Sequence, residues 1–549
     1  YDYIIVGGGT AGCVLANRLT ADEGKKVLVL EAGSSDYKNT LVRIPAGIVK
    51  LFQTKFDWIF NSAAEANVNN REIYLCRGKL LGGSSSLNVL LYHRGDAKDY
   101  DKWAEIADDG SWGPDKVLPY FKKSEDDFRG ESAYHGTGGE LSVNQVQYQN
   151  PLSMTYLNAC KEAGFPANDD FNDWSRPQEG YGRYQVTEKD GARCSAASGF
   201  LHPVLKRKNL DVVTSATVER VSFDGSKAVG VEVQVGGKSQ RIQLAEGGEV
   251  LLTGGSINSP QLLMLSGIGP KAHLEAHGIK TLVDAPGVGK NLQDHPAAVV
   301  SYNTVAEHKG ISVTSKIRIK GTKITNPRVL LQWKLFGKGP FTSTGCDHGG
   351  FFKTKEDLES PDLQMRFLAA RALSPDGMGT FSQFRTSTEQ LDGFSFQSIV
   401  SRPHSRGSVE LKSSDPLAHP VIKTGYFSDE TAADIATMRE GVKLSRKLAQ
   451  TDAFRQYIGE EVYPGKDVQS DAQIDEYIRS SVHTSNALVG TCRIGKAGDA
   501  SAVVGPDLKV IGVTNLRVID ASVMPKIPGG QTSAPTIMIA EKAADLMLA

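Results

Sequence analysis

The first thirty-three residues constrain the fold more than any other stretch of the chain. Residues 1–6 (YDYIIV) are rich in β-branched and aromatic residues, which is typical of a buried parallel strand. Residues 7–12 (GGGTAG) fit the spacing G-x-G-x-x-G, residues 13–19 have helical spacing, and residues 26–30 predict a second strand that runs into Glu31. A strand, glycines, a helix, a strand and an acid in this order predict a dinucleotide-binding unit rather than an ordinary glycine-rich turn.

Each glycine of this motif has a physical role. Gly7 lets the strand turn sharply, Gly9 lets the backbone approach a pyrophosphate, and Gly12 lets the helix pack closely on the strand. The free N–H groups of the helix N-terminus then face the phosphates. Glu31 ends the second strand, where a carboxylate accepts from ribose hydroxyls. This stretch alone leaves open which dinucleotide binds.

Composition excludes several classes of protein. The 549 residues carry 62 Lys and Arg against 63 Asp and Glu, so a net charge of −1 does not favour nucleic acid as a partner. No apolar run approaches the roughly 18 residues of a membrane span. The six cysteines form no CxxC pair, which argues against zinc and a dense disulfide framework, so no metal site is predicted. The sequence opens inside a strand without Met, so we expect that a targeting peptide has been removed or left out.

A second glycine-rich stretch lies at residues 76–88 (CRGKLLGGSSSLN). Two adjacent glycines and three serines suit a tight loop that presents N–H and hydroxyl donors to an anion, followed by a helix with a serine cap. Further on, residues 250–253 predict a strand, and Ser259–Pro260 predicts the start of a helix.

Five motifs together resemble the glucose-methanol-choline oxidoreductase family, whose members bind FAD. They are residues 76–88, 254–270 (GGSINSPQLLMLSGIGP), 287–296 (GVGKNLQDHP), 515–522 (NLRVIDAS) and 534–544 (APTIMIAEKAA). Together with the opening motif they span the whole chain. The resemblance implies an α/β (α+β) fold, in which a Rossmann-like ββα FAD-binding domain is joined to a discontinuous substrate domain with an antiparallel sheet.

The resemblance also implies domain limits and cofactor contacts. The FAD-binding domain is expected at 1–155, 201–298 and 486–549, and the substrate domain at 156–200 and 299–485. Some relatives tether FAD through a His just before the Asn of the serine loop; Leu87 stands there, so FAD is expected to be bound non-covalently. The residues expected to bind FAD are Gly7, Gly9, Thr10, Ala11, Gly12, Glu31, Ala32, Leu81, Gly83, Ser84, Asn88, Val89, Leu90, Leu91, Val218, Asp520, Ala521, Gln531 and Thr532.

Between about 300 and 485 the pattern changes. Short alternating runs at 329–334, 363–367 and 394–400 predict antiparallel strands, and residues 432–448 predict an amphipathic helix. We expect this sheet to cover the flavin. His295 is expected to be a structural histidine at the domain junction, and the acidic run 125–127 a solvated face.

A catalytic base is missing at the expected place. Alcohol oxidases of this family need a base near the flavin, usually His, with a second His or Asn beside it. Here Ala487 and Ser533 occupy the two positions, Asn486 lies next to the first, and His483 is displaced by about one helical turn.

This departure resembles one microalgal branch of the family, which uses blue light on FAD to convert a long-chain fatty acid to a hydrocarbon one carbon shorter. The shared motifs are 345–349 (GCDHG), 361–367 (PDLQMRF), Ser485–Asn486 and 527–532 (IPGGQT). By resemblance, Cys346, Arg366 and Asn486 are catalytic, and Cys346, Arg366, Phe381 and Gln397 contact the fatty acid; Phe381 stands where Tyr is expected. The branch further implies a chloroplast location and contact with a membrane surface without a transmembrane helix.

Purely structural roles stay open for two of these residues. On sequence alone, Arg366 is more often a salt-bridge partner, for instance of Asp362, and Cys346 a small core residue. For the whole chain, the alternatives are a dark alcohol dehydrogenase or oxidase of the same family, a hydroxynitrile lyase, and a flavin light sensor without catalysis.

Overall fold

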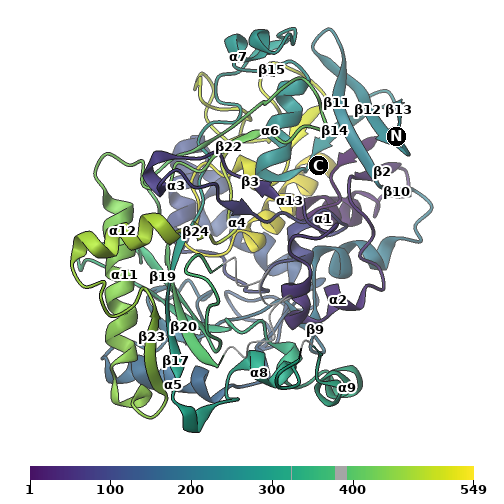
Figure 1. The fold of residues 1–549 in the computed structure, drawn as a ribbon. Coiled ribbons are helices and arrows are strands. Elements are labelled where there is room, and N and C mark those ends of the chain that lie inside the picture. Colours follow the sequence, from purple (N-terminus) through teal and green to yellow (C-terminus); the bar gives the residue numbers. More distant parts are fainter. Residues whose placement is uncertain (323, 378–391) are drawn as a thin grey trace.

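The computed structural model describes residues 1–322, 324–377 and 392–549. Its elements build two sheets that lie side by side, with the parallel sheet at the upper right and the antiparallel sheet at the lower left of Figure 1. Each sheet has its own apolar core. The mixed α/β (α+β) fold class predicted from the sequence is confirmed.

The first sheet has five parallel strands in the order β10-β2-β1-β14-β25. The strands come from three distant parts of the chain: β1 (Tyr3–Val6), β2 (Val27–Glu31), β10 (Leu210–Thr214), β14 (Glu249–Leu252) and β25 (Leu516–Val518). Near-continuous apolar sequence in β1, β2 and β14 fits strands whose two faces are both covered.

Helices from both ends of the chain pack beside this sheet. The α1 helix (Thr10–Leu19) contacts α13 (Ser533–Leu548), which in turn contacts α4 (Pro114–Ser124), so the first and last helices are neighbours (Figure 1). A three-stranded antiparallel sheet of β11 (Ala216–Asp224), β12 (Lys227–Val235) and β13 (Lys238–Gln243) contacts the sheet through β2 and β14.

The second sheet is antiparallel, with the strand order β23-β17-β20-β19-β18-β7, and β24 pairs with β17. Helices α11 (Ala433–Ala449) and α5 (Pro151–Glu162) pack on it, and α12 (Asp471–Ser481) packs on α11. The strands are β7 (Gly180–Arg183), β17 (Pro296–Thr304), β18 (His348–Phe352), β19 (Leu363–Leu368), β20 (Gly393–Val400), β23 (Ile458–Tyr463) and β24 (His483–Thr484). The strands predicted at 363–367 and 394–400 and the helix predicted at 432–448 are confirmed.

Shorter elements connect these layers. The helices are α2 (Thr40–Arg43), α3 (Ala97–Ala107), α6 (Gly255–Leu265), α7 (Lys271–Ala276), α8 (Val313–Ile317) and α9 (Pro327–Phe336). The strands are β3 (Phe60–Asn61), β4 (Tyr74–Leu75), β5 (Glu125–Asp127), β6 (Leu141–Val143), β8 (Glu188–Lys189), β9 (Ala192–Arg193), β15 (Ile268–Gly269), β16 (Val283–Asp284), β21 (Ser408–Glu410) and β22 (Val421–Lys423). Among the described residues, no helix is long and apolar enough to cross a membrane.

Three local predictions were wrong. Residues 329–334 form part of helix α9 rather than a strand, because Asn326 caps Arg328 N at 3.1 Å, Pro327 stands at the first position, and Gly337 ends the helix at φ 60°. Helix α6 begins at Gly255, and Ser259 lies inside it, where its Oγ accepts from Gly254 N at 3.1 Å. The serine loop forms a 3₁₀ turn at Gly83–Ser86 without a serine cap.

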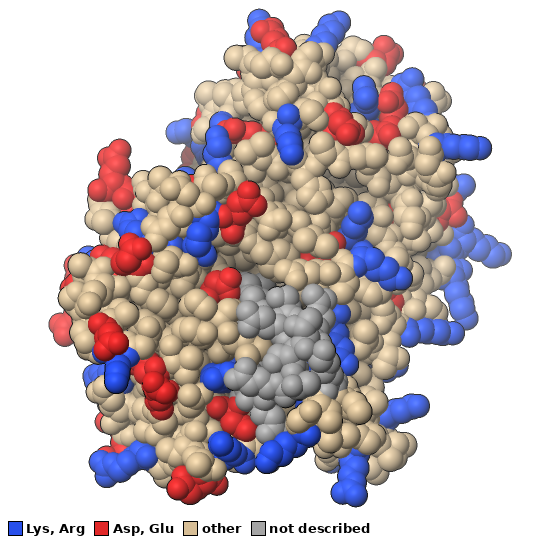
Figure 2. All heavy atoms as spheres, viewed as in Figure 1, with Lys and Arg blue, Asp and Glu red and all other residues tan. Residues whose placement is uncertain are grey.

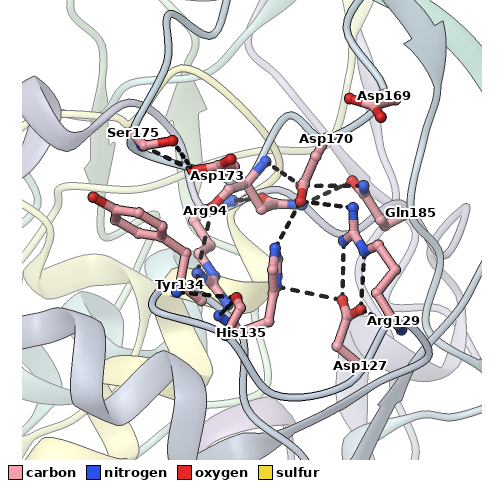
Figure 3. A network of polar contacts seen from close by, with 12 residues as sticks. Arg94, Asp127, Arg129, Tyr134, His135, Asp169, Asp170, Asp173, Ser175 and Gln185 are labelled. Atoms are coloured by element: carbon pink, nitrogen blue, oxygen red, sulfur yellow. Dashed lines mark hydrogen bonds and ion pairs between the residues drawn. The ribbon is translucent and has the colours of Figure 1, made fainter.

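The acidic run 125–127 is not a solvated face, because Glu125 and Asp127 are buried in strand β5. Arg94 Nη2 lies 2.5 Å from Glu125 Oε1 in a fully buried ion pair. Figure 3 shows His135 between Asp127 and Asp170, with Arg129 paired to Asp127. Glu125, Asp127 and His135 bring three ligand-type atoms together, but arginines already pair the carboxylates, and the expectation that the chain holds no metal stays a prediction.

Candidate functional site

A cavity of about 570 Å³ lies between the parallel and the antiparallel sheets, within the size range of small-molecule and cofactor sites. Its walls come from the glycine-rich loops of the parallel sheet and from strands β17, β19 and β20 of the antiparallel sheet. Parallel strands place ligands beyond their carboxyl ends, where loops and helix N-termini meet. The fold therefore puts the cavity where the sequence motifs converge.

The first glycine loop is shaped by close backbone packing. Gly7 has φ 107°, and a Cβ on it would lie 2.8 Å from Thr253 O. A Cβ on Gly12 would lie 2.1 Å from Gly7 O, so only glycine lets α1 pack on β1 here. A Cβ on Gly9 would meet no protein atom nearer than 3.7 Å, although Gly9 lines the cavity. Gly9 therefore leaves room on the side where a ligand would pass.

Glu31 closes this end of the cavity. Its carboxylate accepts from Gly8 N at 2.9 Å and from Gly33 N at 2.7 Å, so its orientation is fixed. Burial raises the pKa of Glu31 to about 7, against the opposing effect of these N–H groups and of Lys79. Donors from a bound ribose would stabilise the carboxylate form of Glu31.

The serine loop forms the facing wall. Gly82 and Gly83 both have positive φ, and a Cβ on Gly83 would lie 2.9 Å from Gly9 Cα, so the two glycine loops touch. Ser84 Oγ accepts from Gly78 N at 3.2 Å, and Asn88 Oδ1 accepts from Arg193 Nη1 at 2.8 Å. Both side chains are thus held by internal partners while they line the cavity.

The C-terminal part of the chain closes the cavity at a third side. Asp520 follows β25, and its carboxylate accepts from Gly255 N at 2.8 Å and from Ser259 Oγ at 2.6 Å. Gln531, Thr532 and Ser533 lead into α13 and line the cavity at the helix N-terminus. Helix α13 begins at Ser533, one residue before the 534–544 motif.

The structure brings most of the expected FAD residues to this cavity. Those that line it are Gly7, Gly9, Thr10, Ala11, Glu31, Ala32, Gly83, Ser84, Asn88, Val89, Val218, Asp520, Ala521, Gln531 and Thr532. Gly12, Leu81, Leu90 and Leu91 do not line it: Gly12 serves helix packing, and the three leucines are buried in neighbouring apolar cores. The cofactor contacts of each residue stay a prediction.

Arg366 is a buried cation in the cavity wall. It lies on β19 with 5% of its surface exposed, and its Nη1 donates to Gln397 Oε1 at a long 3.4 Å. Its Nε has no hydrogen-bond partner, and in the described part of the chain no ion pair joins it to a carboxylate. The alternative of a salt bridge to Asp362 is wrong, because Asp362 accepts from Thr354 and Thr437 instead. Burial lowers the pKa of Arg366, and an anionic ligand would offset this cost.

Cys346 lies near Arg366, two residues before β18. It is 4% exposed, belongs to a small apolar cluster and also lines the cavity. Thr344 Oγ1 lies 3.5 Å from its Sγ. Burial raises the pKa of the Cys346 thiol, so the sulfur keeps its hydrogen at neutral pH.

Asn486 is presented by a constrained turn. Its φ is 63°, and its carbonyl accepts from Arg77 Nη1 at 2.9 Å. The next residue is fixed by buried Asp294, which accepts from Ala487 N at 2.8 Å and from Tyr426 and Thr484 hydroxyls. The buried Asn486 Oδ1 has no hydrogen-bond partner, so it can accept from a water or from a ligand donor.

The two positions where the family carries a base line the cavity as Ala487 and Ser533. Of the described histidines, His93, His295 and His483 do not line it, whereas His419 does, packed on Phe60 at a ring distance of 4.7 Å. Burial lowers the pKa of His93 and His295 to about 3 and that of His483 to about 4. His295 is fully buried near the start of β17, as expected of a structural histidine. Phe381 lies outside the described residues.

Sequence reasoning missed several cavity residues. Arg77 and Lys79 line the cavity and belong to the quoted serine-loop motif, so their position in it was a usable signal. Thr253 and Thr536 line it at the ends of predicted elements. His419 follows an irregular stretch without a motif, and nothing in the sequence marked it.

The residues at the glycine-loop end of the cavity fit FAD. Glycines stand where backbone loops and a ligand must approach closely, a buried acid ends β2, and the α1 N-terminus has no side-chain cap over its free N–H groups. Gly7, Gly9, Glu31, Ser84 and Asp520 would hold the dinucleotide at this end of the cavity.

Comparison with known proteins agrees with a site for FAD. GMC oxidoreductase family models match residues 1–297 and 403–540. The chloroplastic fatty acid photodecarboxylase of Chlamydomonas reinhardtii is 46% identical over 100% of this chain and 90% of its own, and an alcohol dehydrogenase [acceptor] of Pseudomonas putida is 42% identical over 100% and 96%. A formate oxidase variant from Aspergillus oryzae RIB40, studied for FAD modification, superposes with a TM-score of 0.89 at 28% identity over 100% and 98% of the two chains. The chain belongs to the GMC oxidoreductase family, and its cofactor is FAD.

Proposed function

We propose that the protein catalyses the light-driven decarboxylation of long-chain fatty acids to hydrocarbons one carbon shorter. The single observation that carries the proposal is Arg366, a buried guanidinium in the cavity wall without an ion-pair partner among the described residues. Such a cation is stable when it binds an anion, and its planar fork matches a carboxylate. The 46% identical photodecarboxylase of Chlamydomonas reinhardtii supports the same substrate class.

The net reaction converts a carboxylate R–COO⁻ and one proton to R–H and CO2, so it is redox-neutral. FAD, when bound, supplies the absorption of blue light and the reversible exchange of one electron. The residues of this chain bind the substrate, orient it, exclude water and deliver a hydrogen. Placement matters because electron and proton steps depend on distance.

Each proposed residue has a task that its surroundings allow. Arg366 binds the carboxylate, and Gln397, its neighbour across the sheet, lines the same pocket. Asn486 donates to the carboxylate or to a water beside it. Cys346, kept as a thiol by burial, or Arg366 through water supplies the final hydrogen or proton. This proposal also includes the contact of Phe381 with the substrate, the contacts of single residues with FAD, and the domain limits.

The acyl chain needs an apolar path away from Arg366. Ile48, Val49, Phe52, Val299 and Leu368 line the cavity and supply such a surface. We propose a chloroplast location from the chloroplastic relative alone.

The direct test is illumination of the FAD-loaded protein with palmitate, followed by gas chromatography. Pentadecane that forms in blue light and not in the dark supports the proposal. A protein that retains FAD and yields no hydrocarbon in the light refutes it, and a light-induced spectral change without product would point to a sensor.

Oxidation of alcohols is the second candidate, favoured by the 42% identical alcohol dehydrogenase. The lack of a base at Ala487 and Ser533 argues against it, because a missing base typically costs about 10²–10⁴-fold in rate. Rapid anaerobic bleaching of the flavin by primary alcohols in the dark would support this candidate over the first.

Non-covalent attachment of FAD is proposed because Leu87, 2% exposed in the serine loop, offers no nucleophile at the tethering position. Acid precipitation should release all yellow colour to the supernatant. Flavin that stays in the pellet would contradict this.

A further inference from the structure

The segment from Lys309 to Cys346 has an unusual charge balance. It contains eight Lys or Arg and no Asp or Glu, although the whole chain carries nearly equal numbers of both. We call residues 309–322 and 324–346 the basic segment. It includes α8 and α9, and the proposed chemistry uses only Cys346, its last residue.

Helix α9 turns one apolar face inward and another outward. Trp333 is buried, and Val329 and Leu330 pack beside it. Leu331, Leu335 and Phe336 are 54%, 62% and 68% exposed. A helix on the surface of a monomer normally exposes polar residues on its solvent side. The exposed apolar residues of α9 therefore mark this face as a surface that binds a partner.

Two exposed isoleucines just before α9 repeat the pattern. Arg318 and Thr325 form an antiparallel bridge, and Ile319 N donates to Ile324 O at 3.0 Å. Ile319 and Ile324 are 41% and 60% exposed. Among the described residues, five of the fifteen exposed large apolar side chains therefore fall within residues 319–336.

The basic segment is firmly attached to the body of the protein. Ile317, Trp333 and Phe341 form an apolar cluster with Ile44 and Ala46. Trp333 Nε1 donates to Gly191 O at 2.8 Å, and Lys50 Nζ donates to Thr325 Oγ1 at 3.2 Å. The exposed face therefore needs no rearrangement to meet a partner.

Cations surround the exposed apolar side chains. Lys316, Lys320, Arg328, Lys334 and Lys338 are all exposed. Figure 2 shows blue Lys or Arg side chains projecting from a tan surface at its lower right, where Figure 1 places α9. The β8–β9 turn that touches Gly337 adds both Lys189 and Asp190, so the local charge stays positive.

We propose that the basic segment docks the protein on the surface of an anionic lipid bilayer. Leu331, Leu335 and Phe336 enter the boundary between headgroups and acyl chains, and the surrounding cations bind anionic headgroups. A second copy of the chain is the poorer occupant, because two faces of equal positive charge repel each other. An apolar surface ringed by cations is complementary to anionic lipid in both respects.

The location also connects the membrane with the cavity. Thr314 and Thr344, near the two ends of the basic segment, line the cavity, and so does Val49, which packs against the same cluster as Trp333. Docking would place this wall of the cavity next to the lipid phase. A fatty acid partitions into that phase, and this last step alone rests on the proposed function.

The test is flotation of the FAD-loaded protein with phosphatidylcholine vesicles that contain about 30% phosphatidylglycerol, compared with pure phosphatidylcholine. We expect at least about tenfold stronger binding to the anionic vesicles, and weaker binding as salt shortens the Debye length. Equal binding to both vesicles, or no binding to either, would overturn the proposal.

Matched variants locate the surface. Leu335→Ser/Phe336→Ser should reduce vesicle binding about tenfold or more, whereas Leu546→Ser/Leu548→Ser, which removes two leucines exposed by 42% and 45% elsewhere, should not. Lys334→Glu/Lys338→Glu should abolish binding, and Lys238→Glu/Arg241→Glu on β13 should preserve it. Equal losses in both members of either pair would refute the location.

Two further readouts separate the possible outcomes. Flavin absorbance and thermal unfolding show that each variant is folded and loaded, and decarboxylation of detergent-dispersed palmitate should equal that of the wild type. Vesicle binding does not depend on activity, so loss of the proposed function would leave this result intact. If Leu335→Ser/Phe336→Ser instead dissolves a dimer measured without lipid, the occupant is a second copy and the proposal fails.

Discussion

Arg366 and Gln397 face each other across the β19–β20 pair, and Arg366 Nη1 donates to Gln397 Oε1 at 3.4 Å. Gln397 Nε2 in turn donates to His483 Nε2 at 2.8 Å, and burial keeps that histidine neutral by lowering its pKa to about 4. The guanidinium is therefore oriented by a neutral amide and leaves its charge for a ligand. This relationship links the sheet to the proposed binding of a carboxylate.

Gln397→Glu should replace this neutral neighbour of Arg366 with a carboxylate that competes with the fatty acid for the guanidinium. The new carboxylate would stand where Gln397 Oε1 now accepts from Arg366, and would neutralise the cation that the fatty acid needs. We expect the dissociation constant for palmitate to rise at least about tenfold, or about 1.4 kcal/mol, with FAD still bound. Titration of flavin fluorescence measures it, and Gln240→Glu on exposed β13 is the charge control. Unchanged affinity in Gln397→Glu would exclude Arg366 as the receptor.

Alternation in short apolar runs was enough to predict strands β19 and β20, and glycine spacing was enough to predict the first loop. Helix α9 was missed because a run of six residues fits both the two-residue period of a strand and the 3.6-residue period of a helix. The residues that mark the ends of the helix, Asn326, Pro327 and Gly337, lie outside that run. The buried state of Glu125 was missed for another reason. Its partner Arg94 is thirty-one positions away, and long-range pairing leaves no local signal.

Arg366→Lys tests geometry rather than charge. Lysine keeps one positive charge but loses the planar fork that holds a carboxylate by two parallel hydrogen bonds. We expect the light-dependent yield of hydrocarbon to fall by at least about tenfold, with both weaker binding and slower turnover at saturating palmitate. Gas chromatography at several palmitate concentrations separates the two effects. Turnover like that of the wild type would sink the assignment of Arg366.

Cys346→Ser separates hydrogen delivery from packing. Serine keeps the size and a donor, but its O–H bond is much stronger than the S–H bond of the buried thiol. If Cys346 acts late, palmitate should still quench flavin fluorescence, and the later recovery of oxidised flavin after a light flash should slow. If Cys346 only contacts the substrate, the initial quenching itself weakens. Transient absorption records both phases, and no change in either would remove Cys346 from the site.

His135 should make stability depend on pH. Its Nε2 lies 2.7 Å from Asp170, its Nδ1 faces Glu125 and Asp127 at 3.5 and 3.4 Å, and Arg94 and Arg129 are the other charges of the network (Figure 3). Hydrogen bonds to Asp170 and Glu125 outweigh burial and raise the pKa of His135 to about 9. Three acids and two arginines leave one negative charge, which an imidazolium neutralises.

Because the folded pKa of His135 is raised above the unfolded value near 6.5, its contribution is complete below about pH 6.5 and is lost as pH rises through about 9. The contribution is on the order of 3 kcal/mol. The difference in unfolding free energy between wild type and His135→Gln should therefore shrink between pH 6 and pH 9.5, as measured by denaturant titration. A constant difference would show that His135 is not charged in the folded protein.

Gly9→Ala should separate folding from cofactor binding. Gly9 has φ −77° and ψ −161°, which any residue adopts, and its Cβ would meet nothing nearer than 3.7 Å in the protein. Replacing glycine by alanine ahead of α1 costs about 1 kcal/mol or less. The FAD-free variant should thus unfold close to the wild-type denaturant concentration.

The added methyl of Gly9→Ala would instead project into the cavity that Gly9 lines, where the pyrophosphate of FAD is expected. We expect FAD affinity to fall at least about a hundredfold, as measured by flavin fluorescence. Gly12→Ala gives the contrast, because its Cβ would lie 2.1 Å from Gly7 O and 3.1 Å from Thr253 Oγ1, so that variant should lose stability as well. If Gly9→Ala binds FAD like the wild type, the dinucleotide does not pass this loop, and the placement of the cofactor at the α1 N-terminus is wrong.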